Sequence, residues 1–375
     1  MKDTGPKTVV TAGPAPMGPY SPAIVAGDMV YVSGMLGTGP DGQMVGADVA
    51  SQTRQILDRL AEVLTAAGSS MDQVLSTSVF IKNAADFSAM NEAYRPYFPS
   101  AAPTRTTVTA DLLSGALVEI SAVAALSGAA RETMHPEGWA KSGRPYSLIV
   151  KSGGLVFLSG LISRRGEDDS FAPGDVAAQT RTVLENAKTL LATAGLTLKD
   201  VVASKVFISS QEHFKAMNDT YRTYFATEPP ARATAVTALM TPDYLVEITL
   251  VATTGDREVL GPSVAPTLPL STAVRSGDRI FLSGVLGNTD ANLGDAGAQT
   301  RETLARIKRT LESQGMTFAN VVDTVVYLPS LDDFDAMNEA YREAFPFAPP
   351  ARATFGTGLV NPNGLVELVM TAVRQ

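Results

Sequence analysis

The sequence predicts an α+β protein built from three tandem copies of one β-β-α-β-α-β-β unit, which close into a pseudo-trimer. Two observations predict this fold. The same motifs recur three times in the same order along the 375 residues. Each copy also switches between hydrophobic periods of two and of about 3.6 residues in a fixed order. Because each copy has the size of a domain, we expect three sheets facing inward around a pseudo-threefold axis rather than an open solenoid.

The first recurring element is a strand, which ends in Ser-Gly. The apolar run at residues 30–36 returns at 156–162 and at 280–286. A hydroxyl followed by a residue without a side chain lets a ligand approach the backbone closely. The serines are therefore candidate substrate-binding residues. They are Ser33, Ser159 and Ser283.

The second element is an amphipathic helix. It opens with Gln-Thr-Arg at residues 52–54, 179–181 and 299–301, and a glycine closes it in the position of a helix C-cap. The three glycines are Gly68, Gly195 and Gly315. We expect this helix to pack one apolar face on the sheet.

A β-branched strand at residues 74–81 comes next, and a second helix follows it. Phe87, Met90 and Tyr94 share one helical face at spacings of three and four. A short polar residue stands where this helix needs an N-cap in every copy. These expected N-caps are Asn83, Ser210 and Ser330.

An asparagine recurs in the middle of the second helix, where its helix propensity is poor, so a hydrogen-bonding role is expected. The asparagines are Asn91, Asn218 and Asn338. In every copy, 39 residues separate the Gln that opens the first helix from this Asn, so that block carries no insertion or deletion. Chance does not produce such a spacing three times.

Two further strands carry an arginine and a glutamate. The arginine follows a Pro-Thr or Pro-Ala pair, 14 residues after each Asn, and the glutamate follows 14 or 15 residues later. A fixed guanidinium offers a planar fork to a carboxylate, and a carboxylate amid apolar residues needs a cation or a catalytic reason. The arginines are Arg105, Arg232 and Arg352. The glutamates are Glu119, Glu247 and Glu367.

Two structural alternatives stay open for these strands. If the two strands form a simple hairpin, each Arg and the following Glu are cross-strand partners in a structural ion pair. A threonine stands two residues after each Arg, on the same face of the strand, where it either lines a cleft or merely suits a strand. The threonines are Thr107, Thr234 and Thr354.

The unit boundaries fall where the sequence turns small, polar and rich in proline. These places are residues 127–131 and residues 254–262. We expect one unit at residues 1–128, a second at 129–256 and a third at 257–375. All three are close to the commonest domain size.

Composition indicates a folded protein and excludes several kinds of chemistry. The chain has 45% hydrophobic and 18% charged residues, which excludes a disordered or fibrous chain. It has no cysteine and only two histidines, so cysteine nucleophiles and metal sites rich in Cys or His are not expected. His135 and His213 receive no role, because neither recurs among the copies. The net charge of −8 argues against nucleic acid or an anionic membrane as the main partner.

The location follows from what the chain lacks. Residues 1–6 have no apolar core like that of a signal peptide, and no stretch reaches the roughly 18 apolar residues of a membrane helix. We expect a soluble protein with the cytoplasm as its default location. The possibility that a leader was removed earlier stays open.

The motifs together resemble the Rid family, the YjgF-like enamine/imine deaminases that are also labelled endoribonuclease L-PSP proteins. The resemblance rests on Gly-Pro-Tyr-Ser-Pro-Ala at residues 18–23, the Val-Ser-Gly strand, Gln-Thr-Arg, Met-Asn-Glu-Ala-Tyr at 90–94, Pro-Thr-Arg at 103–105 and Leu-Val-Glu-Ile at 117–120. It implies a chorismate-mutase-like unit that trimerises, with ligand clefts between neighbouring units. It also implies that another strand separates the Arg strand from the Glu strand.

The resemblance further implies the reaction. A 2-aminoacrylate-type enamine or its imine is hydrolysed to a 2-keto acid and ammonia, without a cofactor or a metal. Arg holds the substrate carboxylate, Glu positions water and shuttles a proton, and Ser, Asn and a tyrosine shape the pocket. The tyrosines are Tyr20 and Tyr146, and Leu270 replaces the third one. The loop from Ser283 to Gln299 is also shorter, with 16 residues against 19 and 20. The three clefts are therefore not expected to be equivalent.

Other functions stay open. A module that binds a small carboxylate for regulation needs the same Arg, and a specialised hydrolase or biosynthetic enzyme, such as a chorismatase, uses the same plan. A ribonuclease is disfavoured by the acidic charge and by the absence of a recurring histidine. The expected partner is a small carboxylate-bearing substrate, and the expected assembly is a monomeric pseudo-trimer. Whether pseudo-trimers associate further is not determined by the residues.

Overall fold

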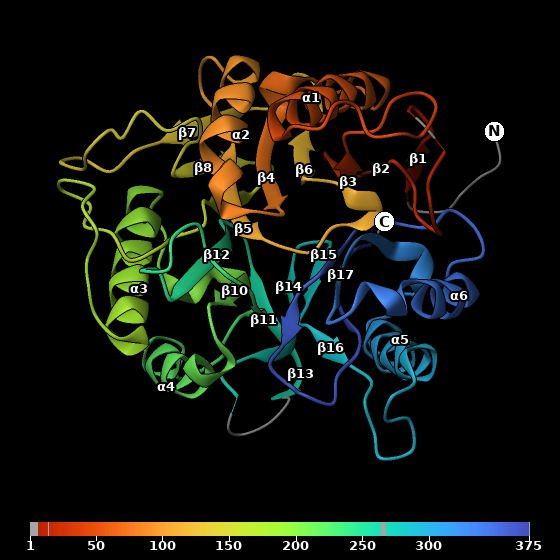
Figure 1. Cartoon of the computed structure of the whole chain (residues 1–375). Coiled ribbons are helices and arrows are strands. Elements are labelled where there is room, and N and C mark those ends of the chain that lie inside the picture. The colour runs from red at the N-terminus through yellow and green to blue at the C-terminus, as the bar shows by residue number, and fades with distance from the viewer. Residues whose placement is uncertain (1–6, 14, 264–267, 375) are drawn as a thin grey trace.

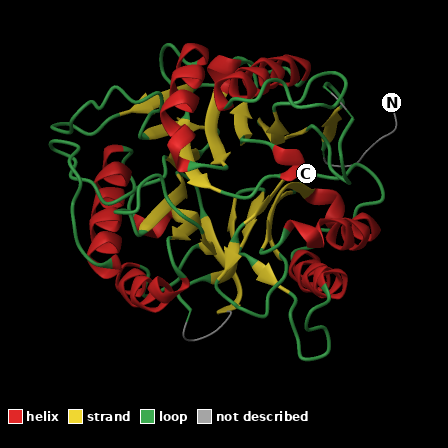
Figure 2. Ribbon diagram, in the orientation of Figure 1, coloured by secondary structure: helices red, strands yellow, loops and turns green. Residues whose placement is uncertain are grey.

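The computed structural model describes residues 7–13, 15–263 and 268–374. The chain forms three units of one plan around a common centre, with strands inside and pairs of helices outside (Figures 1 and 2). This arrangement confirms the predicted α+β pseudo-trimer with inward-facing sheets. The opening residues 1–6, on which the expectation about a leader depends, lie outside the described residues.

Unit 1 contains six strands and two helices. In chain order they are β1 (Thr8–Val10), β2 (Ala23–Ala26), β3 (Met29–Leu36), α1 (Val49–Ala66), β4 (Val74–Ile81), α2 (Phe87–Tyr94), β5 (Thr104–Thr109) and β6 (Val118–Ala125). The strand β1 precedes the predicted elements. It pairs with β2 at the edge of the sheet. The predicted β-β-α-β-α-β-β order therefore lacks this first strand.

Unit 2 repeats this order, and it also begins with an additional edge strand. Its elements are β7 (Arg131–Met134), β8 (Ile149–Ser152), β9 (Leu155–Leu158), α3 (Val176–Thr193), β10 (Val201–Ile208), α4 (Phe214–Tyr224), β11 (Ala231–Val236) and β12 (Val246–Thr253).

Unit 3 follows the same plan with two short additional strands. Its elements are β13 (Arg257–Ser263), β14 (Ser271–Ser276), β15 (Arg279–Leu282), β16 (Val285–Leu286), α5 (Ala296–Ser313), β17 (Val321–Leu328), α6 (Phe334–Ala344), β18 (Ala351–Gly356), β19 (Gly358–Leu359) and β20 (Glu367–Val373).

The sheet order separates the Arg strand from the Glu strand. In unit 1 the order is β1-β2-β3-β6-β4-β5, and β5 runs parallel to β4. Arg105 therefore lies beside Thr77 of β4, while Glu119 lies beside Phe80 of the same strand. The hairpin alternative is wrong, because the helix α2 makes a crossover between two parallel strands and places β5 at the edge of the unit.

The first helix of each unit begins three residues before the predicted Gln. An aspartate caps it by accepting a hydrogen bond from a backbone N–H in the first turn. The aspartates are Asp48, Asp175 and Asp295. The C-terminal glycine was placed correctly: Gly68 has φ 77°, and the N–H of Ser69 bonds the carbonyl of Leu64 in a Schellman motif.

The predicted N-caps of the second helix belong to a short 3₁₀ turn that precedes it. Ser210 and Ser330 accept hydrogen bonds from the N–H groups two residues later, whereas the side chain of Asn83 makes no capping bond to the backbone. The α-helices themselves begin at Phe87, Phe214 and Phe334. None of the helices in the described part of the chain combines the length and the apolar composition that a bilayer crossing needs.

Neighbouring units are joined by the same contact at all three junctions. The backbone N–H of a serine in one unit donates to the carbonyl of the proline two residues before the arginine of the neighbouring unit. One example runs from Ser21 to Pro350 at 3.0 Å. The other two contacts are Ser147 to Pro103 and Ser271 to Pro230. Because β11 also pairs with β14 and with β19, the sheets of units 2 and 3 form one hydrogen-bonded sheet.

The hydrophobic core has two kinds of cluster. One cluster inside each unit packs the helices on the sheet. Two further clusters contain side chains from all three units and lie where the inner faces of the sheets meet. This contact between units removes the inner sheet faces from water, which is the driving force for closing the ring.

Candidate active site

Each junction brings the arginine of one unit together with the glutamate of the next. Arg105 interacts electrostatically with Glu247, Arg232 with Glu367, and Arg352 with Glu119. We name the three sites the Arg105, Arg232 and Arg352 clefts. The candidate residues of one unit are thus divided between two clefts. Arg, Asn and Thr come from one unit, and Tyr, Ser and Glu come from the following unit.

The arginine side chains are buried, and their donors are only partly used. Arg105, Arg232 and Arg352 are 2–3% exposed. In all three, Nε and Nη1 have no hydrogen-bond partner among the described residues. Unused donors on a planar guanidinium suit the oxygens of a carboxylate. Because an unpaired buried donor is costly, these atoms indicate a site for an anionic group.

A tyrosine from the second helix supports each guanidinium. The Cζ atom of Arg105 lies 4.9 Å from the ring centre of Tyr94, and the other two pairs have 4.8 and 5.0 Å. Those pairs are Arg232 with Tyr221 and Arg352 with Tyr341. Cation–π contacts of this kind hold the plane of the guanidinium in one orientation.

The predicted serines fix the backbone of the arginines. The hydroxyl of Ser159 accepts a hydrogen bond from the N–H of Arg105 at 2.9 Å and donates to the carbonyl of Ser147 at 2.7 Å. Ser33 and Ser283 do the same for Arg352 and Arg232. Their hydroxyls therefore join two units and position the Arg strand.

The three glutamates are buried and carry raised pKa values. Burial raises the pKa of Glu119, Glu247 and Glu367 to about 8. At neutral pH these carboxyl groups are therefore largely protonated. A protonated carboxyl beside a carboxylate-binding fork can donate a proton to a substrate and later accept one.

The glycine after each serine makes room for the glutamate. A Cβ atom at Gly34 would lie 1.9 Å from Oε1 of Glu119, and one at Gly160 would lie 1.9 Å from Oε1 of Glu247. The distance at Gly284 to Glu367 is 1.8 Å. The sequence reasoning expected the glycine to serve a ligand. The side chain that needs it is the glutamate of the same unit.

The glutamine at the start of the first helix braces the Glu strand. Oε1 of Gln52 accepts a hydrogen bond from the N–H of Leu117, two residues before Glu119, at 2.8 Å. Gln179 and Gln299 make the same bond to the N–H groups of Leu245 and Leu365. Sequence reasoning noted this residue only as a helix start.

The asparagines lie beside the arginines. Oδ1 of Asn91 accepts a hydrogen bond from Nη2 of Arg105 at 2.6 Å. Oδ1 of Asn218 and of Asn338 is buried without a partner among the described residues. The expected hydrogen-bonding role of the mid-helix Asn is therefore realised towards the arginine in one cleft.

The threonines contribute their backbone and leave hydroxyls in the clefts. The N–H of Thr107 donates to Oε1 of Glu247 at 3.4 Å, and the N–H of Thr354 donates to Glu119. The hydroxyls of Thr234 and Thr354 are buried without a partner among the described residues. Thr354 and Thr234 also line the cavities in front of their arginines.

The predicted tyrosines distinguish the clefts. The Cζ atom of Arg352 lies 5.3 Å from the ring centre of Tyr20, and that of Arg105 lies 4.9 Å from the ring centre of Tyr146. These contacts are additional to those with the helix tyrosines. In the third cleft Leu270 lines the cavity instead. Arg232 accordingly has one aromatic contact, to Tyr221.

The cavities differ strongly in size and lining. The cavity in front of Arg352 and Glu119 has about 30 Å³, whereas the one in front of Arg232 and Glu367 has about 530 Å³. Leucine and valine side chains line much of the larger cavity. Beside Tyr146 lies a polar cavity of about 280 Å³ lined by Arg144, Arg164 and Asp169. The replacement by Leu270 coincides with the widest cleft.

Two functional residues in each unit were missed by the sequence reasoning. The tyrosine under each Arg was assigned to packing only, and the Gln to the helix start. The sequence contains a signal for both the tyrosine and the glutamine. Each recurs in all three copies, the Tyr three residues after the Asn and the Gln at a constant spacing from it.

Neither histidine lines the cavities in front of Arg232 and Arg352. His135 lines the polar cavity near Tyr146, and Nδ1 of His213 lies 3.2 Å from the hydroxyl of Ser209. Within residues 7–13, 15–263 and 268–374, no group of three or more His, Cys, Asp or Glu side chains is placed to hold a metal ion.

Comparison with known proteins shows the repeat directly. The family model described as Endoribonuclease L-PSP matches residues 10–126, 140–254 and 262–374. The 3-aminoacrylate deaminase RutC of Acinetobacter baylyi is 38% identical over 122 residues, which cover 32% of this chain and 97% of that protein. The 2-iminobutanoate/2-iminopropanoate deaminase of Bos taurus is 40% identical over 121 residues, which cover 32% and 88%.

One solved structure resembles the fold over most of the chain. A chorismatase structure has a TM-score of 0.58 with 15% identity, and the match covers 80% of this chain and 93% of that structure. At this identity the likeness concerns the fold alone.

Proposed function

Because this chain belongs to the endoribonuclease L-PSP family, whose model it matches three times, we propose that it hydrolyses enamines and imines of the 2-aminoacrylate type to 2-keto acids and ammonia. The observation that carries the proposal is the repeated pair of a buried Arg with two unused donors and a buried Glu with a raised pKa. Relatives named as imine and aminoacrylate deaminases support the same chemistry.

The arginine binds the substrate carboxylate. Nε and Nη1 of Arg105 are unused donors, and the stacking on Tyr94 and Tyr146 keeps the plane of the guanidinium in place. The serine bond to the arginine N–H fixes the strand from which the side chain extends. Binding in one orientation places the C–N centre of the substrate near the glutamate of the next unit.

The glutamate moves the proton. Its carboxyl donates a proton to the enamine carbon, which leaves the iminium and a carboxylate on the enzyme. That carboxylate then accepts a proton from the water that attacks the iminium carbon, and the carbinolamine forms. Transfer of this proton to the amine makes ammonia the leaving group. As the C–N bond breaks, the carboxylate takes the proton of the carbinolamine hydroxyl, which leaves the 2-keto acid and restores the carboxyl, so one water is consumed for each ammonia released. A pKa of about 8 keeps the carboxyl in its donating form at neutral pH.

The clefts differ in the substrates that they admit. The narrow Arg352 cleft suits a substrate with a very small substituent, and the wide, largely apolar Arg232 cleft suits one with a bulky apolar substituent. The fused chain can hold these different pockets because each unit diverges separately, which a homotrimer cannot do.

The test uses 2-aminoacrylate generated in the assay by a β-eliminating lyase, with 2-keto acid release followed in time. We expect the chain to accelerate the release over the buffer rate. The triple variant with Glu119, Glu247 and Glu367 changed to Gln should lose this acceleration. Release at the buffer rate by the unchanged chain contradicts the proposal.

A binding module is the second candidate, since the Arg fork alone would serve it. Pyruvate binding and keto-acid release by the unchanged chain together distinguish the two. If the unchanged chain binds pyruvate but does not accelerate release, the carboxylate site is a binding site and the deaminase proposal fails. If it does both, the enzyme proposal stands.

A further inference from the structure

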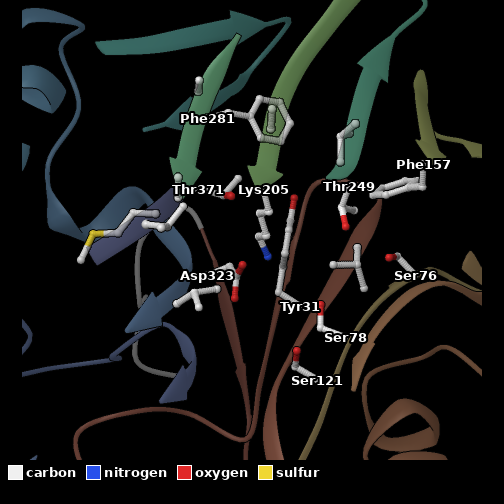
Figure 3. A pocket seen from close by; sticks show the side chains of 18 of the residues that line it. Tyr31, Ser76, Ser78, Ser121, Phe157, Lys205, Thr249, Phe281, Asp323 and Thr371 are labelled. Carbon is white, nitrogen blue, oxygen red and sulfur yellow. The ribbon is translucent and has the colours of Figure 1, made fainter. Parts of the chain in front are cut away.

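A largely apolar cavity that contains a few polar and charged side chains lies where the inner faces of the three sheets meet. It has a volume of about 130 Å³. Equivalent strands of every unit line it, including Tyr31 of β3, Phe157 of β9 and Phe281 of β15 (Figure 3). We name it the axial chamber. Arg232 lines both this chamber and its own cleft, whereas Arg105 and Arg352 do not line the chamber.

The axial chamber carries charges that the repeat does not share. Lys205 of β10 is equivalent to Ser78 in unit 1 and to Val325 in unit 3. Asp323 of β17 is equivalent to Ser76 and to Ala203. In a homotrimer either residue would occur three times around the axis and repel its copies. The fused chain places one ammonium and one carboxylate there instead.

The two charged side chains point into the same space without touching. Figure 3 shows Lys205 and Asp323 extending towards the chamber from different strands. They interact electrostatically, yet no ion pair within 4.0 Å joins them in the described part of the chain. Burial lowers the pKa of Lys205 and raises the pKa of Asp323 to about 6. Both groups are therefore held in surroundings that disfavour their charged forms.

A few neutral polar groups also lie in the wall. The hydroxyl of Tyr31 is buried and interacts with the guanidinium of Arg279. Ser121 and Thr371 also line the chamber, whereas the hydroxyl of Thr249 is already bonded to that of Thr106 at 2.6 Å. The carboxylate of Asp323 accepts a hydrogen bond from the N–H of Thr324.

We propose that the axial chamber binds one small zwitterionic α-amino acid, whose carboxylate pairs with Lys205 and whose ammonium group pairs with Asp323. A zwitterion satisfies both unpaired charges at once and brings no net charge into the low-dielectric centre. A simple carboxylate or a simple amine satisfies one charge and leaves the other unpaired.

The size of the chamber restricts the ligand. An apolar cavity of about 150 Å³ holds a molecule no larger than benzene, so the chamber admits glycine, alanine or serine and excludes amino acids with large side chains. The proposal does not depend on deaminase activity, because neither Lys205 nor Asp323 lines the cavities in front of Arg232 and Arg352.

The test is titration calorimetry of the full chain with glycine, L-alanine and L-serine. We expect one site per chain, with binding at least tenfold weaker in Lys205→Met and in Asp323→Asn. The binding that Lys205→Met abolishes should be at least tenfold weaker for acetate, methylamine and L-tryptophan than for L-alanine. Lys199→Met is the matched control, because Lys199 is exposed, and it should bind like the unchanged chain.

Keto-acid release assays of the same variants separate this site from the clefts. Lys205→Met should retain the rate of the unchanged chain while it loses L-alanine binding. A crystal structure with L-alanine should show the ligand between Lys205 and Asp323. Equal affinity of Lys205→Met and the unchanged chain, or equal affinity for acetate and L-alanine, overturns the proposal. A crystal structure with L-alanine only in the clefts also overturns the proposal.

Discussion

The carboxyl group of Glu119 lies directly against the backbone of Gly34, so closely that a Cβ atom at Gly34 would stand 1.9 Å from Oε1. Gly160 with Glu247 and Gly284 with Glu367 repeat this relationship. The Ser-Gly pair thus does two things at adjacent positions. The serine holds the Arg strand of the preceding unit, and the glycine admits the Glu of its own unit.

Gly34→Ala should therefore displace Glu119 and inactivate the Arg352 cleft. We expect at least a tenfold lower keto-acid release, measured in a chain where Glu247 and Glu367 are Gln so that only this cleft can act. Overpacking should also cost about 1–3 kcal/mol of stability. Gly255→Ala is the control, since its Cβ would make only an ordinary contact. Full activity of Gly34→Ala would show that the carboxyl position is not needed.

Arg105→Lys should weaken carboxylate binding in its cleft by roughly tenfold to a hundredfold, since an ammonium cannot reproduce the planar array of donors on a guanidinium. Pyruvate titration in a background with Lys at the other two arginines measures this directly. Arg181→Lys, on the exposed surface of α3, is the matched control. Unchanged pyruvate affinity after all three arginines are replaced would remove the clefts as carboxylate sites.

Leu270→Tyr should narrow the Arg232 cleft. A tyrosine there can stack on Arg232 as Tyr146 stacks on Arg105, and it would occupy part of the cavity of about 530 Å³. We expect turnover of enamines with bulky apolar substituents to fall several-fold, with 2-aminoacrylate turnover unchanged. The control Leu293→Tyr lies at an exposed position. An unaltered substrate profile would mean that Leu270 does not set the specificity.

The stability of the chain should fall as the pH rises from about 5 to about 8. Each of the three glutamates has a pKa of about 8 in the fold, above the ordinary value of 4.5. Between these values the folded chain holds protons that the unfolded chain has released. The stabilising contribution is therefore complete below about pH 4.5 and is lost as the pH rises through about 8.

Urea unfolding at pH 5, 7 and 9 measures this slope. Glu119→Gln should reduce the slope of the unfolding free energy against pH by at most about 1.4 kcal/mol per pH unit, because one group then no longer titrates. Glu212→Gln on the surface should leave it unchanged. A slope that is the same in Glu119→Gln would show that Glu119 does not carry a raised pKa.

Much of the fold could be predicted from local pattern. The strand at residues 74–81 and the C-terminal glycine of the first helix were placed correctly, because period and turn chemistry act over a few residues. The helix starts were set three residues late, since Asp48 and its equivalents were overlooked as caps. The edge strands β1, β7 and β13 were missed, because short edge strands carry little periodic signal.

The sequence by itself determined that there are three copies, that their order of elements is common, and that an Arg, a Glu and an Asn recur in each. It also indicated the family that the comparison with the family model then confirmed. These conclusions need only spacing along the chain, which the residues display directly.

Only the tertiary structure decided which arginine meets which glutamate. The parallel pairing of β4 with β5 puts Arg105 at the edge of its unit, while β6 holds Glu119 in the interior of the same sheet. An edge residue must complete its site with the neighbouring unit, so Arg105 meets Glu247 and Glu119 meets Arg352. The meeting of Lys205 and Asp323 at the axis has the same origin, because it depends on how whole sheets face one another.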